Sequence, residues 1–184
     1  MSAREVILDA ADRVLRDEGV ARATTRRIAL EAGFSEALLY KHFADKRELF
    51  LAVLHERTPP LPPRRPLDHG TPRARVSALV ADVVDYYGRA FPLAATLLGE
   101  RSLLAGWREL LAAHPPGPHQ PVAQVRDQLE AERAAGNLSP ALDPQGVAEL
   151  LCGGALQHVF MAEFAGPTET SAEVAERLVA ALAL

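Results

Sequence analysis

Apolar residues recur every three to four positions along most of the chain, with polar residues between them. This spacing places the apolar side chains on one face of an α-helix. No run alternates apolar and polar residues in the manner of a half-buried strand. The pattern therefore predicts an all-α protein with helices over residues 4–18, 24–32, 35–43, 45–57, 72–89, 91–98, 101–113, 122–135, 143–164 and 171–182.

Two of the predicted helices are short and separated by a tight turn. Gly33 is expected to end the first, because glycine accepts a positive φ at little steric cost. Ser35 is expected to cap the second, with its side-chain oxygen accepting a backbone N–H. A helix, a short turn containing glycine and a second helix together predict a helix-turn-helix. Its core would be built from Ile28, Phe34, Leu39 and Phe43.

This segment contains an ordered set of residues that resembles the sequence motif of a known protein family. It comprises Thr25, Ile28-Ala29, Ala32-Gly33, Ser35, Leu39, Tyr40, His42, Phe43, Lys46 and Leu49. Over residues 4–57 the set strongly resembles the DNA-binding domain of the TetR family of bacterial transcriptional regulators. The resemblance implies an N-terminal three-helix DNA-binding domain, followed by a larger helical ligand-binding and dimerisation domain. It also implies a homodimer on a near-palindromic operator, more often as a repressor.

The sequence departs from the family pattern at two neighbouring positions. The family often has glycine where Ala37 stands and a small polar residue where Leu38 stands. Both positions lie on the face that would read bases, so the operator sequence cannot be carried over from the resemblance.

A proline-rich segment, residues 58–71, divides the chain. Proline cannot continue a helix and biases the preceding residue away from one. We therefore expect a DNA-binding domain with its connecting helix at residues 1–57, a linker at 58–71 and an effector-binding and dimerisation domain at 72–184. The prolines and arginines of the linker also match a polyproline ligand. A helical protein-interaction module without sequence-specific DNA binding is thus the alternative function.

Basic charge is concentrated in the helix-turn-helix, although the whole chain has a net charge of −4. Residues 22–47 contain both lysines of the chain and have a basic excess, which suits phosphate contact. By resemblance, Thr25, Tyr40, His42 and Lys46 contact phosphates, and Arg26 and Arg27 are additional candidates. The candidates for base contact at the start of the second helix are Ser35, Glu36, Ala37 and Lys41.

The C-terminal helices provide candidates for two further sites. The resemblance implies that the last two helices form the dimer interface, and many apolar residues and a Gly-Gly pair there agree with it. The candidate residues are Val147, Leu151, Gly153, Gly154, Val174, Leu178, Val179 and Leu182. The family usually carries a ligand cavity in its helical body. Here the predicted lining is Tyr86, Tyr87, Phe91, Trp107, His158, Phe160, Met161 and Phe164, which would suit a small apolar or aromatic effector.

Other classes of protein find little support. Cys152 is the only cysteine, no apolar run is long enough to span a bilayer, and the N-terminus lacks the apolar centre of a signal peptide. We therefore expect a cytoplasmic protein. No catalytic or phosphate-binding motif is present, so we expect neither an enzyme nor a cofactor. His114 and His119 alone are weak evidence for a metal site.

Overall fold

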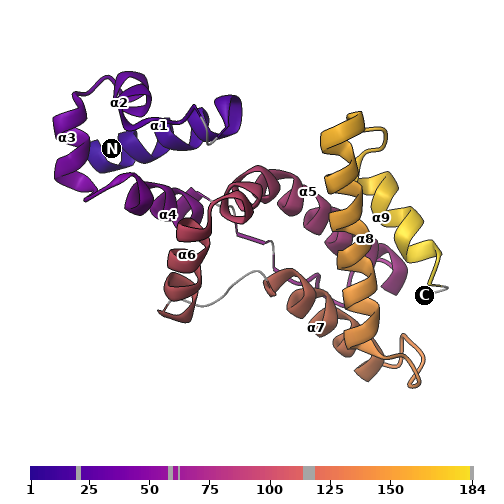
Figure 1. Cartoon of the computed structure of the whole chain (residues 1–184). Coiled ribbons are helices and arrows are strands. Elements are labelled where there is room, and N and C mark those ends of the chain that lie inside the picture. The colour runs from indigo at the N-terminus through magenta and orange to yellow at the C-terminus, as the bar shows by residue number, and fades with distance from the viewer. Residues whose placement is uncertain (20–21, 58–59, 62, 114–118, 183–184) are drawn as a thin grey trace. The chain divides into compact units, whose positions relative to one another are not determined.

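The computed structural model describes residues 1–19, 22–57, 60–61, 63–113 and 119–182. These residues form nine helices and no strand, which confirms the predicted all-α fold (Figure 1). The helices are α1 (Ala3–Glu18), α2 (Thr25–Ala32), α3 (Glu36–His42), α4 (Lys46–Arg57), α5 (Pro72–Gly99), α6 (Arg101–Ala113), α7 (Gln120–Ala134), α8 (Pro144–Ala165) and α9 (Ser171–Ala180).

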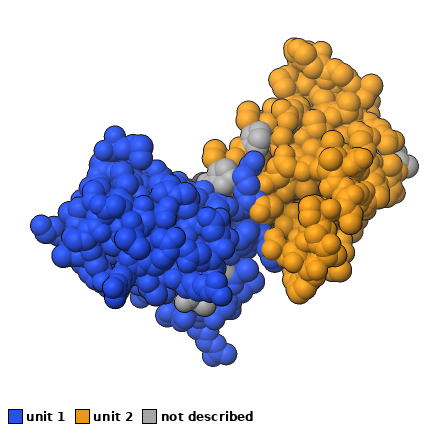
Figure 2. All heavy atoms as spheres, turned by 90° about the horizontal axis from the view of Figure 1, so that it is seen from above, with its two compact units in different colours: residues 1–59, 89–115 blue, residues 60–88, 116–184 orange. Residues whose placement is uncertain are grey.

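The chain divides into two compact units (Figure 2). Unit 1 comprises residues 1–59 and 89–115, and unit 2 comprises residues 60–88 and 116–184. These packing units differ from the functional division expected from the sequence. The last part of α5 and all of α6 pack with the N-terminal helices, whereas most of the proline-rich segment packs with unit 2.

The core of unit 1 is built as the helix-turn-helix pattern requires. Helix α1 packs against α2, α3 and α4, and Ile28, Leu39 and Phe43 are buried between them. Gly33 ends α2 in the left-handed conformation, at φ 73°. The Ser35 hydroxyl caps α3 by accepting a hydrogen bond from the backbone N–H of Leu38, at 3.2 Å. The predicted turn geometry is therefore confirmed.

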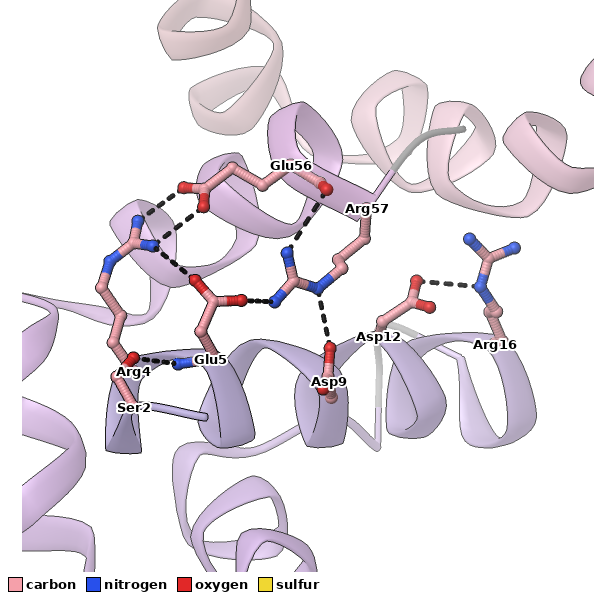
Figure 3. Close-up of polar contacts among 8 residues, drawn as sticks. All are labelled: Ser2, Arg4, Glu5, Asp9, Asp12, Arg16, Glu56 and Arg57. Carbon is pink, nitrogen blue, oxygen red and sulfur yellow. Dashed lines mark hydrogen bonds and ion pairs between the residues drawn. The ribbon is translucent and has the colours of Figure 1, made fainter. Parts of the chain in front are cut away.

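Arginine–carboxylate pairs hold α4 against α1 (Figure 3). Arg4 donates two hydrogen bonds to the Glu56 carboxylate, at 2.8 and 2.5 Å. Arg57 donates to Asp9 at 2.8 Å and to Glu5 at 2.6 Å. The hydrogen bonds from Arg4 lower the pKa of Glu56. These contacts join the first and last helices of the N-terminal segment.

Two details of the helices differ from the sequence prediction. Residues 72–99 form the single helix α5, which continues through Pro92. Proline removes one backbone hydrogen bond and strains the preceding turn, but burial of Leu93 and Leu97 in the core of unit 1 offsets this cost. In addition, α9 ends at Ala180, before the predicted end at residue 182; at its start, Thr170 forms a capping box with Glu173.

Unit 2 contains a buried ion pair that attaches the linker to its core. Arg75 donates to both oxygens of Glu132, at 2.5 and 2.6 Å, and to the backbone carbonyls of His69 and Gly70. Gln128 accepts a hydrogen bond from the backbone N–H of Arg65. Because these residues of the segment are engaged within unit 2, the structure disfavours the segment as a free polyproline ligand.

Candidate nucleic-acid interface

Helices α2 and α3 present most of the predicted DNA contacts on one surface of unit 1. Burial of Leu39 fixes the rotation of α3, so Ala37, Tyr40 and Lys41 are exposed. Ser35 is also exposed, although its hydroxyl serves as the helix cap. Exposure at these positions is what direct contact with a duplex requires.

A chain of hydrogen bonds links α2 to α3 on this surface. The Thr25 hydroxyl donates to the Glu36 carboxylate, with 2.5 Å between Oγ1 and Oε1. The Tyr40 hydroxyl lies 3.3 Å from Thr25 Oγ1. Thr25 is only 8% exposed, whereas Tyr40 is 48% exposed. The sequence placed Glu36 among the base-reading residues, but in the structure its carboxylate points to an intramolecular donor.

The candidate cations differ in whether they already form ion pairs within the protein. Arg26, Lys41 and His42 are exposed, and none forms an ion pair within the part of the chain that the structure describes. Arg27 instead donates to Glu18 at 2.8 Å and to Glu31 at 3.2 Å. Arg27 would therefore have to break its hydrogen bonds to Glu18 and Glu31 before it could contact a phosphate.

Lys46 lies at the start of α4. Its ammonium is 4.9 Å from the centroid of the Phe50 ring. A cation above an aromatic face is attracted by the negative face of the ring. This contact positions the Lys46 side chain, and no carboxylate among the described residues forms an ion pair with its ammonium.

The predicted effector-lining residues belong to both units and differ in their exposure. Phe91 and Trp107 belong to unit 1, where Trp107 packs against the core. Phe160, Met161 and Phe164 are exposed on α8, the last at 75%. Their side chains therefore do not line the interior of unit 2. The sequence could not separate the faces of α8, because apolar residues occur on all sides of that helix.

Tyr86, Tyr87 and His158 remain as half-buried candidates in unit 2. The two tyrosine rings are in contact, with 5.7 Å between their centroids. The Tyr87 hydroxyl is hydrogen-bonded to the Cys152 thiol, and burial raises the pKa of Tyr87. Burial also raises the pKa of Cys152 to about 12. The thiol is therefore protonated at neutral pH and is not an activated nucleophile.

Neither a cluster of metal ligands nor a membrane-spanning helix occurs among the described residues. No three potential metal ligands gather anywhere in the described ranges, where His119 is exposed; His114 lies outside those ranges. None of the described helices combines the length and the apolar character needed to cross a membrane.

The predicted dimer residues also separate into different environments. Leu151, Val174 and Val179 are buried within the protomer, so they form its core rather than a surface for a second copy. A Cβ atom at Gly154 would lie 2.7 Å from Leu178 Cδ2 of the same chain, whereas one at Gly153 would meet open space. The Leu178 side chain of α9 thus packs closely on Gly154 of α8 within the protomer. Val147, Leu178 and Leu182 are half-buried.

The other side of α8 carries large exposed apolar side chains, with the exposed Gln157 among them. Leu150 is 66% exposed and Phe164 75%, and Leu156, Phe160 and Met161 lie between them. The rings of Phe160 and Phe164 pack edge to face, with centroids 5.1 Å apart. These five residues are called the α8 stripe below. They repeat at helical spacing on the side opposite to Cys152 and Val159, which are buried.

Comparison with known proteins relates the chain to regulators. Residues 7–53 match the model of the bacterial regulatory proteins of the tetR family. The HTH-type transcriptional repressor Rv1474c of Mycobacterium tuberculosis is 26% identical over 135 residues, which cover 73% of this chain and 68% of the relative. The nucleoid occlusion factor SlmA of Marinobacter nauticus is 43% identical over 53 residues, but the match covers only 27% of that protein.

The whole fold is also similar to solved structures. A TetR transcriptional regulator from Agrobacterium tumefaciens superposes with a TM-score of 0.77 at 22% identity, over 97% of this chain and 91% of that protein. At this identity the similarity concerns the fold, and it includes the helices beyond the helix-turn-helix.

Proposed function

Because the chain belongs to the TetR family of bacterial regulatory proteins, we propose that it binds a near-palindromic operator as a homodimer and represses transcription until a small effector releases it. We assign DNA contact to residues 1–57 and dimerisation and effector binding to residues 72–184. Residues 58–71 connect the two functions.

The observation that carries this proposal is the surface formed by α2 and α3. Its exposed groups include the phenol of Tyr40, the ammonium of Lys41 and the imidazole of His42. All three can donate hydrogen bonds to phosphate oxygens or base edges. They project from a short helix whose opposite side is fixed by Leu39 and by Phe43 at the end of that helix. A rigid helix with donors on its exposed side is the geometry of a major-groove reader.

The α8 stripe supports the homodimer. Contiguous exposed apolar side chains on a folded protein are a common feature of interaction surfaces. A second copy would present the same stripe, and two such stripes can meet across a two-fold axis. Gly153 lies among these residues with open space above it, so the helix of a partner could approach closely there.

The effector is proposed to bind in unit 2 near Tyr86 and Tyr87. Both rings are half-buried, and together they offer an aromatic wall with polar tips, which suits a small apolar or aromatic molecule. Release of DNA would follow if such a molecule bound one conformation of the dimer better than the other.

Selection of random duplex DNA by the purified protein, followed by sequencing, tests the proposal. Enrichment of a near-palindrome is expected, with half-site centres separated by about one helical turn of DNA or a multiple of it. The variant His42→Ala serves as the comparison and should retain less DNA. If wild-type protein enriches no sequence and behaves like His42→Ala, the helix-turn-helix is not used to read DNA.

A further inference from the structure

Glu36 has an environment unlike that of the other candidate DNA contacts. It is half-buried at the start of α3, and no Arg, Lys or His among the described residues forms an ion pair with it. Its carboxylate instead accepts a hydrogen bond from Thr25 Oγ1 at 2.5 Å. Thr25 and Tyr40 are the two hydroxyl donors assigned to phosphate contact. A negatively charged acceptor therefore already occupies the donors that a negatively charged phosphate would need.

Each hydroxyl has a single proton to donate, and this fixes the direction of both hydrogen bonds. An ionised carboxylate can only accept, so Thr25 donates its single proton to Glu36. Thr25 Oγ1 then has only lone pairs left for the contact with Tyr40 at 3.3 Å. The proton between these two oxygens consequently belongs to Tyr40. The Tyr40 proton is therefore directed toward Thr25, and the Thr25 proton toward Glu36.

We infer that Glu36 is a positioning residue that holds the Thr25 and Tyr40 hydroxyls away from DNA phosphates until the protein binds a duplex. This inference rests on the proposed function. A phosphate oxygen is also an acceptor, so it gains these donors only when they leave the carboxylate. The exchange has the same cost on every duplex, because phosphates carry no sequence information. Glu36 thus lowers affinity for all DNA without reading a base.

Glu36→Gln tests this role, because glutamine keeps the shape and an acceptor oxygen but removes the charge. A hydrogen bond to a neutral amide is weaker than one to a carboxylate. We expect the affinity for the selected operator and for a scrambled duplex to rise equally, by about fivefold. The ratio of the two affinities should not change. Glu130→Gln, which removes the same charge from an exposed position on α7, should leave both affinities unchanged.

A double-mutant cycle separates positioning from a general effect of charge. Thr25→Val replaces the bridging hydroxyl by a methyl group of similar size, so Glu36 no longer holds a donor. In this background the gain from Glu36→Gln should fall below about twofold. An equal gain in both backgrounds would mean that Glu36 acts only as a remote charge, and the inference would be wrong. Thermal unfolding of each variant verifies that it is folded.

The remaining outcomes also decide the question. If Glu36→Gln weakens operator binding and changes one base in the selected sequence, then Glu36 reads a base and is not a positioning residue. If wild-type protein binds DNA and Glu36→Gln binds identically, the contact is only structural. If wild-type protein binds no duplex even at low salt, the proposed function fails and this inference fails with it.

Discussion

Lys46 illustrates how single residues would contribute to DNA affinity. Its ammonium is positioned by the Phe50 ring, and contact with a phosphate would release condensed counterions. Lys46→Ala is expected to weaken binding to all duplexes and to reduce the slope of log K against log salt by about 0.9. Titrations at several salt concentrations measure the slope. Arg126→Ala, at a partly exposed position on α7, is the control, and an unchanged slope for Lys46→Ala would remove Lys46 from the contacts.

Glu132 is a residue on which the stability of unit 2 should depend. It is completely buried and accepts from Arg75, Gln128 and Asn137. Glu132→Gln would leave the Arg75 guanidinium buried without its counter-charge. We expect a loss of about 3–5 kcal/mol in the free energy of unfolding, measured with denaturant. Glu130→Gln, an exposed position on the same helix, should change it by less than about 1 kcal/mol.

The same carboxyl gives this stability a pH dependence. The hydrogen bonds from Arg75 lower the pKa of Glu132 below its ordinary value. A carboxyl whose pKa is lower in the folded state stabilises the fold above its unfolded pKa, and this contribution is lost as pH falls through the folded pKa. The free energy of unfolding of wild-type protein should therefore decrease below about pH 4.3. Glu132→Gln should show a smaller decrease, and parallel curves would contradict the assignment.

At the residue scale, the sequence predicted what local chemistry determines. The left-handed Gly33, the Ser35 cap and the buried Leu39 depend on neighbours within a few positions, and all three predictions are confirmed. The bond between Thr25 and Glu36 depends on how α2 packs on α3. Spacing along the chain contains no direct record of that packing, so the sequence could not predict this bond.

At the scale of the elements, the adjacent glycines of α8 allow a matched comparison. Glycine to alanine in a helix gains the same intrinsic propensity at either position. An added Cβ at Gly153 meets nothing, whereas one at Gly154 would lie 2.7 Å from Leu178 Cδ2. We expect Gly154→Ala to be less stable than Gly153→Ala by about 1–3 kcal/mol, the usual cost of overpacking. Thermal or chemical unfolding at low protein concentration measures the difference. Equal stabilities would show that Leu178 moves aside freely.

The spacing of apolar residues does not predict the full extent of α5 or the buried side of α8. The sequence predicted two helices over residues 72–89 and 91–98, but they form the single helix α5, with two leucines buried beyond Pro92. Helix α8 is apolar on all sides, so its sequence cannot identify which side faces the protomer. The burial of Leu151 and the exposure of Leu150 are decided by α7 and α9, the helices that pack against α8. For this reason, some residues predicted at the dimer surface are buried in the protomer, and some residues predicted to line a cavity are exposed.

At the scale of the whole molecule, the proposed homodimer would bind its operator through two DNA-binding domains acting together. Joining two half-site readers makes the second contact intramolecular, which raises apparent affinity by about 10²–10⁴ when the geometry fits. Dissociation of the dimer should therefore reduce binding to a palindrome far more than binding to a single half-site.

The α8 stripe makes this dependence testable by a change that leaves the protomer core intact. Phe164 is 75% exposed in the protomer, so Phe164→Glu should not unfold it. Across a two-fold axis, however, it would place carboxylates in an apolar contact without partners. We expect sedimentation equilibrium to detect monomers and the affinity for the palindrome to fall by about a hundredfold. Leu98→Glu is the matched control, since Leu98 is 74% exposed but lies in unit 1. A stable Phe164→Glu dimer would show that the α8 stripe is not the interface.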